Sequence, residues 1–203
     1  MIHLPGLQTE GGSLSWAIFD DSRTHRLLLG RQWADASLWP TMVTVGLNPS
    51  DADHLKDDQT IRKEIGFAKR YGCGGLIKAN LLTIIETESR KLKDLRLEQS
   101  LHPSWEAALR AALVPHGVGS IYVAAWGQLS NHVWHLSRSS RGAAHHLAEA
   151  PHLYCFGRCK KTSRHARSEP RHTSRIAYST PLVSLATGEL HPTKPKAMGK
   201  AIS

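Results

Sequence analysis

Four short apolar runs place the tightest limit on how this chain can fold. They lie at residues 42–45, 76–82, 120–127 and 152–157. The first run, Met-Val-Thr-Val, lacks the polar alternation of a strand with one solvated face, which favours a strand buried on both faces. Residues 58–71, 103–114 and 130–138 have helical spacing and lie between the runs. Strands that alternate with helices predict an α/β fold, with a mainly parallel four-stranded sheet flanked by helices.

A hairpin is expected ahead of this sheet, within residues 14–35. Residues 16–19 predict one strand, 20–22 a turn and 26–29 the returning strand. The length of 203 residues suits one domain, and we expect residues 1–187 to form it. Residues 188–203 hold two prolines and three lysines, and are expected to form a flexible basic tail.

Charge and composition narrow the class of protein. Lys and Arg number 26 against 17 Asp and Glu, a net charge of +9 that favours a polyanion such as nucleic acid. A solvated basic surface is the alternative interpretation. No apolar run approaches the roughly 18 residues that a membrane span needs. No secretory signal is visible, so we expect a cytoplasmic protein with no membrane contact.

Three cysteines are too few for a disulfide framework. Cys155 and Cys159, with His165, suggest zinc, but their spacing is irregular and Cys155 lies in a strand pattern. A buried free thiol is the favoured interpretation. We therefore expect no metal and no cofactor.

A polar or glycine-containing motif follows each apolar run. The motifs are Gly46-Leu47-Asn48-Pro49-Ser50, then Asn80, then Trp126-Gly127, and finally a basic loop at 158–175 that holds Arg171-His172-Thr173-Ser174. Each has an ordinary structural interpretation as a turn, a cap or a core residue. In open α/β sheets, however, ligands bind beyond the carboxyl ends of the strands. Four such motifs at equivalent ends predict one site.

These motifs resemble the uracil-DNA glycosylase superfamily in order and spacing, over roughly residues 42–175. The first has the Gly-x-Asn-Pro form of the mismatch-specific branch. A more specific similarity is to an uncharacterised bacterial and phage family, which names no activity. Its core of Asn-Pro-Ser-x-Ala-Asp, Asp-Asp-x-Thr-Ile-Arg and Gly-Phe-Ala-x-Arg is matched by residues 48–53, 57–62 and 66–70.

This chain departs from the glycosylase pattern in one motif. The loop at 172–174 lacks the proline of the usual His-Pro-Ser sequence, whereas a literal His102-Pro103-Ser104 occurs between the second and third runs. We interpret that second copy as a helix start, with Pro103 at the first helical position.

The glycosylase resemblance implies an α/β/α enzyme that flips a base out of DNA and hydrolyses its N-glycosidic bond, leaving an abasic site. His172 would donate a hydrogen bond to the departing base, and Asn48 would orient the attacking water. Asn80 can present both a donor and an acceptor to a base edge. Other residues assigned to the base are Gly46, Leu47 and Ser50.

The basic loop would bind the DNA backbone. Its assigned residues are Lys160, Lys161, Arg171, Ser174 and Arg175, and either Arg175 or Ile176 could wedge into the gap left by a flipped base. Asp51, Asp53 and Asp58 are nearby carboxylates that could act as a base. Their alternative role is as acids favoured by a helix start.

Ser50 bears on the substrate. Uracil-specific relatives carry a bulky tyrosine in that neighbourhood, so a serine leaves room for a bulky 5-substituent. The expected substrate is a modified pyrimidine, such as hypermodified cytosine in phage DNA, and the expected role is antiviral defence. The partner would be double-stranded DNA with a flipped base, and the protein a monomer.

Two other functions stay open. One is a non-catalytic nucleic-acid-binding module on the same fold. The other is an enzyme acting on nucleosides or nucleotides, which the lack of a glycine-rich phosphate loop disfavours.

Overall fold

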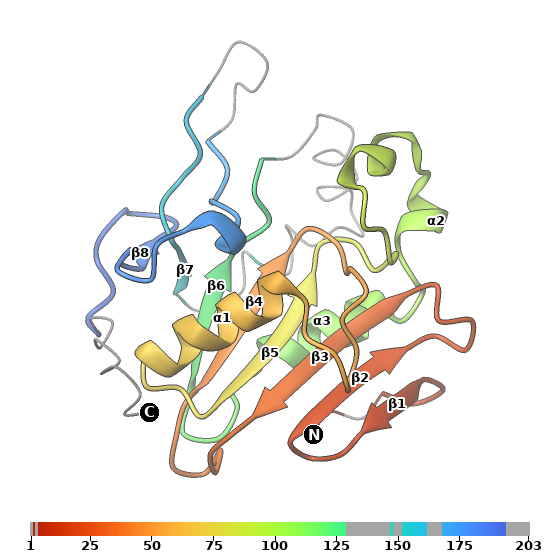
Figure 1. Cartoon of the computed structure of the whole chain (residues 1–203), viewed down its shortest axis with the longest axis horizontal. Coiled ribbons are helices and arrows are strands. Elements are labelled where there is room, and N and C mark those ends of the chain that lie inside the picture. Colours follow the sequence, from red (N-terminus) through yellow and green to blue (C-terminus); the bar gives the residue numbers. More distant parts are fainter. Residues whose placement is uncertain (1, 3, 129–146, 148–151, 162–167, 194–203) are drawn as a thin grey trace.

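The computed structural model describes residues 2, 4–128, 147, 152–161 and 168–193. Within them one eight-stranded sheet runs in the order β1-β2-β3-β5-β4-β6-β7-β8 (Figure 1). The strands are β1 (Gln8–Gly11), β2 (Ser15–Phe19), β3 (Arg26–Gln32), β4 (Thr41–Gly46), β5 (Gly75–Asn80), β6 (Ser120–Ala124), β7 (Leu153–Cys155) and β8 (Val183–Ser184). The helices are α1 (Gln59–Arg70), α2 (Leu97–Ser100) and α3 (Trp105–Leu113), with 3₁₀ turns η1 (Ser89–Asp94) and η2 (Thr173–Arg175). The predicted α/β class is confirmed.

The four predicted apolar runs form the parallel centre of the sheet. They become β4, β5, β6 and β7, and β4 pairs in parallel with both β5 and β6, while β6 pairs in parallel with β7. Gly46 lies opposite Asn80, and Val45 lies opposite Ala124. The carboxyl ends of three neighbouring strands therefore lie at one level of the sheet.

The expectation of a mainly parallel four-stranded sheet is wrong. The predicted hairpin forms as β2 and β3, but β3 also pairs antiparallel with β5, and β8 pairs antiparallel with β7. Residues 26–30 of β3 are all buried. A buried strand needs hydrogen-bond partners along both edges, because unpaired backbone groups are costly away from water. β5 supplies the second edge, which makes the hairpin part of the sheet.

Alternation along the central strands divides the core between two faces. Met42 and Leu76 pack against α1 through Phe67, and Val43 and Ile77 lie in the cluster that contains α3. In Figure 1, α1 lies in front of the sheet and α3 behind it. Since side chains alternate with a period of two, residues 44, 46, 78 and 80 share the α1 face.

The helix boundaries follow from local capping. Asp58 caps α1, because its Oδ1 accepts a hydrogen bond from the Ile61 N–H at 2.7 Å. α3 begins at Trp105 with Ser104 as its cap, so Pro103 precedes the helix and its expected place at the first helical position is wrong. The predicted helix at 130–138 lies outside the described residues. Among those that are described, no helix has the length and apolarity to cross a membrane.

Part of the basic loop is held by backbone hydrogen bonds between its two sides. Residues 157–161 and 168–171, here called the basic arm, run antiparallel, with the Cys159 N–H donating to the Glu169 carbonyl at 2.7 Å and the Arg171 N–H to the Gly157 carbonyl at 3.0 Å. Figure 1 shows this arm projecting beyond the carboxyl ends of the parallel strands. The arm leads directly into η2.

The chain after β8 turns back on itself at first. The His191 N–H donates to the Leu182 carbonyl at 2.9 Å. Residues 194–203, most of the expected flexible tail, lie outside the described part of the chain.

Candidate functional site

A cavity of about 600 Å³ lies where β4, β5 and β6 end. The turn at η2 and both legs of the basic arm, through Cys159 and Arg171, also line it, so the motifs from all four predicted strand ends meet there. Residues predicted from the sequence that line it are Gly46, Leu47, Asn48, Ser50, Asp58, Asn80, Arg171, His172, Ser174 and Arg175. Trp126 and Gly127 also line it.

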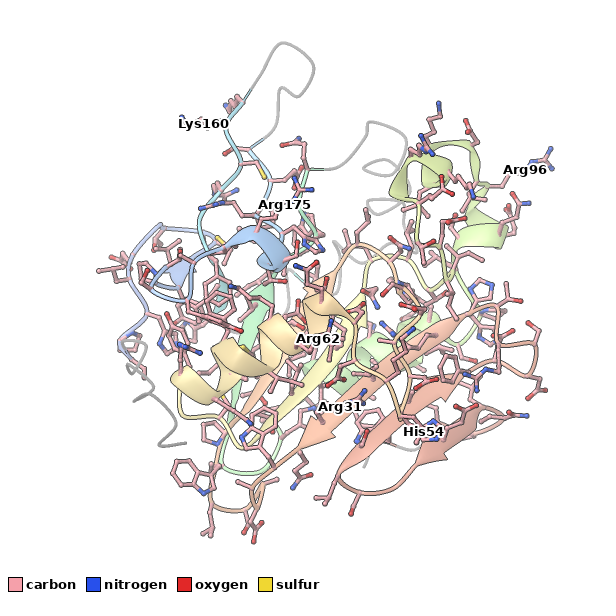
Figure 2. The ribbon with its side chains drawn as sticks, in the orientation of Figure 1. Arg31, His54, Arg62, Arg96, Lys160 and Arg175 are labelled. Carbon is pink, nitrogen blue, oxygen red and sulfur yellow. The ribbon has the colours of Figure 1, made fainter. Side chains whose placement is uncertain are left out.

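Other predicted residues lie away from the cavity. Asp51 pairs with Lys56 at 2.5 Å on the surface, and Asp53 accepts a hydrogen bond from the Leu55 N–H at 2.8 Å. Lys160 and Lys161 are exposed on the basic arm. Figure 2 shows Lys160 and Arg175 at the same end of the molecule, with Lys160 farther out.

Ile176 is only 2% exposed and packs in the core beneath α1. A side chain buried there cannot insert into a DNA stack, so the expectation that Ile176 could be a wedge is wrong. Arg175 is exposed and lines the cavity, and its role as the wedge stays a prediction.

Asn80 is the least satisfied polar side chain of the site. It is 3% exposed, and neither its amide nitrogen nor its amide oxygen has a hydrogen-bond partner among the described residues. Leaving such a group unpaired costs about 1–3 kcal/mol. A Cβ at Gly46 would lie 2.8 Å from the Asn80 Oδ1 atom, so a larger residue at 46 would displace this amide. The amide is thus a buried donor and acceptor presented to the cavity.

His172 presents a single ring proton to the cavity. Its Nδ1 accepts from the Ser174 N–H at 3.3 Å and lies 2.9 Å from the Ser174 hydroxyl oxygen. The proton of the neutral ring is therefore on Nε2. Although the side chain is exposed at the cavity rim, desolvation by surrounding atoms and the charge of Lys78 lower its pKa, which favours the neutral ring.

Gly127 permits the position of His172. Its φ is +75°, and a Cβ there would lie 3.2 Å from the His172 Cβ atom. A side chain at 127 would thus be strained in its backbone and crowded against the histidine.

Asn48 is anchored through its amide nitrogen. Its Nδ2 donates to the Glu86 carbonyl at 2.6 Å and to the Pro49 carbonyl at 2.9 Å, so Oδ1 is the side-chain atom left to accept from a ligand or water. Ser50 donates its hydroxyl to Asp58. The Asn-Pro-Ser motif therefore fastens the loop after β5 to the start of α1.

Three buried charged residues, two lining the cavity and one beneath it, were missed by the sequence interpretation. Lys78 is 4% exposed and lines the cavity, and its Nζ lies 2.7 Å from Oε1 of Glu64, which is fully buried. Arg26, also a lining residue, is 2% exposed. Burial lowers the pKa of Arg26 to about 10, which leaves it charged at neutral pH. The sequence did contain a sign of these residues. Lys78 interrupts one apolar strand run and Arg26 begins another, and charged residues are rare in such runs.

The carboxylate of Glu64 holds several elements together. Its Oε1 also accepts from the Thr173 hydroxyl at 2.9 Å, and its Oε2 accepts from the Thr44 hydroxyl at 2.8 Å. α1, β4, β5 and η2 therefore meet at one buried group beneath the cavity.

Two carboxylates, Asp58 and Glu86, are the acidic side chains among the described residues that line the cavity. Glu86 was not predicted. Its backbone carbonyl holds Asn48, which places this residue beside the Asn-Pro-Ser motif. Trp126 Nε1 donates to Glu169 at 3.0 Å and so links the strand end to the basic arm.

The cysteines have the character of free thiols. Cys155 is buried and Cys159 half-buried, and burial raises the pKa of both. Within the part of the chain that the structure describes, no group of three or more His, Cys, Asp or Glu residues could hold a metal ion. His165 lies outside that part.

Comparison with protein families gives one match. The model of a family described as "Protein of unknown function (DUF1643)" matches residues 26–172, which begin and end at two residues of the cavity. The match is compatible with the similarity to an uncharacterised family. The resemblance to uracil-DNA glycosylases stays a prediction. No curated protein and no solved structure matches the chain.

Proposed function

The chain belongs to the DUF1643 family, and because that membership assigns no activity, we propose from the site itself that the protein is a DNA glycosylase. It would act as a monomer on double-stranded DNA, bind a flipped pyrimidine in the cavity and hydrolyse its N-glycosidic bond.

The unpaired amide of Asn80 is the observation that carries this proposal. A pyrimidine base presents a donor and an acceptor side by side on its Watson–Crick edge, which suits a carboxamide. Binding such an edge would satisfy both Asn80 atoms, which have no partner among the described residues. The cost of leaving them unpaired would then be offset in the complex and not in the free protein.

The rest of the cavity suits the cleavage chemistry. As the C1′–N1 bond breaks, negative charge moves onto the base, and His172 Nε2–H would donate a hydrogen bond to it. Asn48 Oδ1 would accept a hydrogen bond from the attacking water. Asp58 or Glu86 would take the proton that this water loses, since both line the cavity.

The surroundings favour a DNA substrate over a free nucleoside. Arg171 and Arg175 are exposed at the cavity rim, and the basic arm extends beyond it. Cations placed around the opening suit the phosphates that flank a flipped nucleotide. The volume of about 600 Å³ falls within the range of small-molecule sites and supports a pyrimidine with a bulky 5-substituent. On this basis we propose hypermodified phage bases as substrates, and defence against phage as the role.

An excision assay tests the proposal. The protein would be incubated with oligonucleotides bearing uracil, mismatched thymine or mismatched uracil, and with phage genomes that carry bulky modified pyrimidines. Alkaline strand breakage reveals abasic sites. We expect breakage by the wild type, and its loss in Asn48→Ala and His172→Ala. His102→Ala is the matched control, because His102 belongs to the literal His-Pro-Ser sequence but does not line the cavity.

Two outcomes would favour the other functions. Tight, salt-sensitive DNA binding without breakage on any substrate would indicate a non-catalytic binding module. Base release from free nucleosides, with no requirement for DNA, would indicate a small-molecule enzyme.

A further inference from the structure

The ion pair of Lys78 and Glu64 is oriented with its positive end toward the cavity. Lys78 lines the cavity, whereas the fully buried Glu64 lies behind it and accepts hydrogen bonds from Thr44 and Thr173. These hydroxyl groups stabilise the carboxylate, so the pair has a defined direction. An ammonium group at the inner end of a site attracts negative charge on whatever occupies it.

The polar ends of Lys78 and Asn80 lie next to the same backbone position, Gly46. A Cβ at Gly46 would lie 2.7 Å from Lys78 Nζ and 2.8 Å from Asn80 Oδ1, so both atoms flank the Gly46 backbone. The two side chains are two residues apart on β5 and therefore share a face. A ligand bound by the Asn80 amide would lie beside the ammonium group.

A purely structural role explains this pair poorly. Buried ion pairs are often no more stabilising than well-packed apolar residues of similar volume, because both charges lose their hydration. Arg26 places a second buried cation on the cavity wall, and its Nε has no hydrogen-bond partner in the described part of the chain. Two buried cations at one cavity indicate a ligand that is, or becomes, negative.

We propose that Lys78 is a further catalytic residue, whose ammonium group stabilises the negative charge on the departing base. This inference rests on the proposed glycosylase function and deepens it. The C1′–N1 bond breaks and its electron pair leaves with the base as an anion. A water oxygen then bonds to C1′ and releases one proton to a carboxylate and onward to solvent, and solvent protonates the free base.

Glu64 is a positioning residue in the same arrangement. One of its oxygens contacts both Lys78 and Thr173, and Thr173 directly follows His172. The carboxylate thereby fixes the ammonium group relative to the turn that carries the imidazole. Glu64 therefore holds both the Lys78 ammonium group and the turn that carries the His172 Nε2–H.

The test must distinguish the effect of the Lys78 charge on catalysis from the effect of the ion pair on the stability of the fold. Either single change would leave the other residue as an uncompensated buried charge, so the informative variant is Glu64→Gln/Lys78→Met, compared with the wild type. Lys78→Arg keeps the charge, and Lys69→Met is a control that removes one exposed lysine of α1 away from the cavity. Single-turnover cleavage would be measured on otherwise identical oligonucleotides whose leaving base carries 5-substituents of graded acidity.

We expect the double variant to cleave about 100-fold more slowly than the wild type, the scale of losing one anion-stabilising donor. The loss should grow as the leaving base becomes less acidic, and Lys78→Arg should recover part of the rate. A second readout needs no turnover: calorimetry should show that the wild type binds barbiturate, a pyrimidine that is anionic at neutral pH, more tightly than uracil. The double variant should lose that preference.

The outcomes distinguish the two proposals. If the wild type cleaves, but the double variant keeps the same rate and the same dependence on leaving-base acidity, Lys78 has no catalytic role while the glycosylase function stands. Equal binding of barbiturate and uracil by the wild type would also count against Lys78. If the wild type cleaves no substrate, the proposed function fails and the catalytic role of Lys78 fails with it.

Discussion

Replacing Asn80 by valine should stabilise the free protein and abolish its function. The asparagine is 3% exposed and both polar atoms of its amide lack a partner among the described residues, at a cost of about 1–3 kcal/mol. Valine removes that cost and suits a central strand. We expect the free energy of unfolding to rise by about 1–3 kcal/mol, which corresponds to a Tm increase of roughly 2–12 °C in a protein of this size.

The assay is thermal and urea denaturation of the free protein, run beside the excision assay. Thr44→Val is the matched control, because Thr44 lies on the same sheet face, on the adjacent strand β4. Its buried hydroxyl donates to Glu64 at 2.8 Å, so valine, which keeps a β-branched side chain of similar size, removes a hydrogen bond to a charged group. That variant should lose about 1.5–3 kcal/mol of stability.

A fall in Tm for Asn80→Val would refute the reasoning, since it would mean that the asparagine contributes to the free fold. Unchanged excision by a stably folded Asn80→Val would refute the assignment of this amide to the substrate. Opposite signs for the two valine variants, together with lost excision in Asn80→Val, are the expected result.

Three further predictions concern pH, salt and the backbone. Burial lowers the pKa of four described histidines: His25, His116, His172 and His191. The unfolded chain therefore binds more protons than the native protein below about pH 6.5, so the free energy of unfolding should fall as pH drops from 7.5 to 5.5. Urea denaturation at these two pH values measures the fall, and His116→Gln should reduce it; equal falls in variant and wild type would contradict this. Replacing Lys160 and Lys161 together by glutamine should make the slope of log binding constant against log salt shallower by about 2 for duplex DNA, as titrations at several salt concentrations would show. An unchanged slope would place the arm away from the DNA. Gly127→Ala should cost about 1–2 kcal/mol in unfolding free energy, because its φ is +75°, and should slow excision by displacing His172; full activity would argue against that contact.

Local patterns were enough to locate most of the secondary structure. The helix at α1 was predicted from its helical spacing. Its cap is equally local, because the Asp58 side chain accepts from the Ile61 N–H three positions further along the chain. The parallel strands were recognised because a strand buried on both faces has an apolar sequence. Their polar ends then predicted a cavity at one edge of the sheet, where the structure has one.

Local sequence patterns could not predict which distant segments of the chain pair with each other. The hairpin sequence indicates that β3 has one partner in β2, but not that β5 covers its other edge. Likewise, the acidic residues after Asn48 look alike in the sequence, and only the folded loop shows Asp58 at the cavity and Asp51 on the surface. Such choices depend on backbone groups and charges that are far apart along the chain.

The sequence by itself determined which residue types end each strand, because strand period, caps and turns are set by neighbours within a few positions. Only the tertiary structure decided how those ends combine into a site. Glu64 contacts Lys78 and Thr173, which lie 14 and 109 positions away along the chain. The burial that makes this contact strong comes from packing α1 onto the sheet, and no segment of the chain carries that information alone.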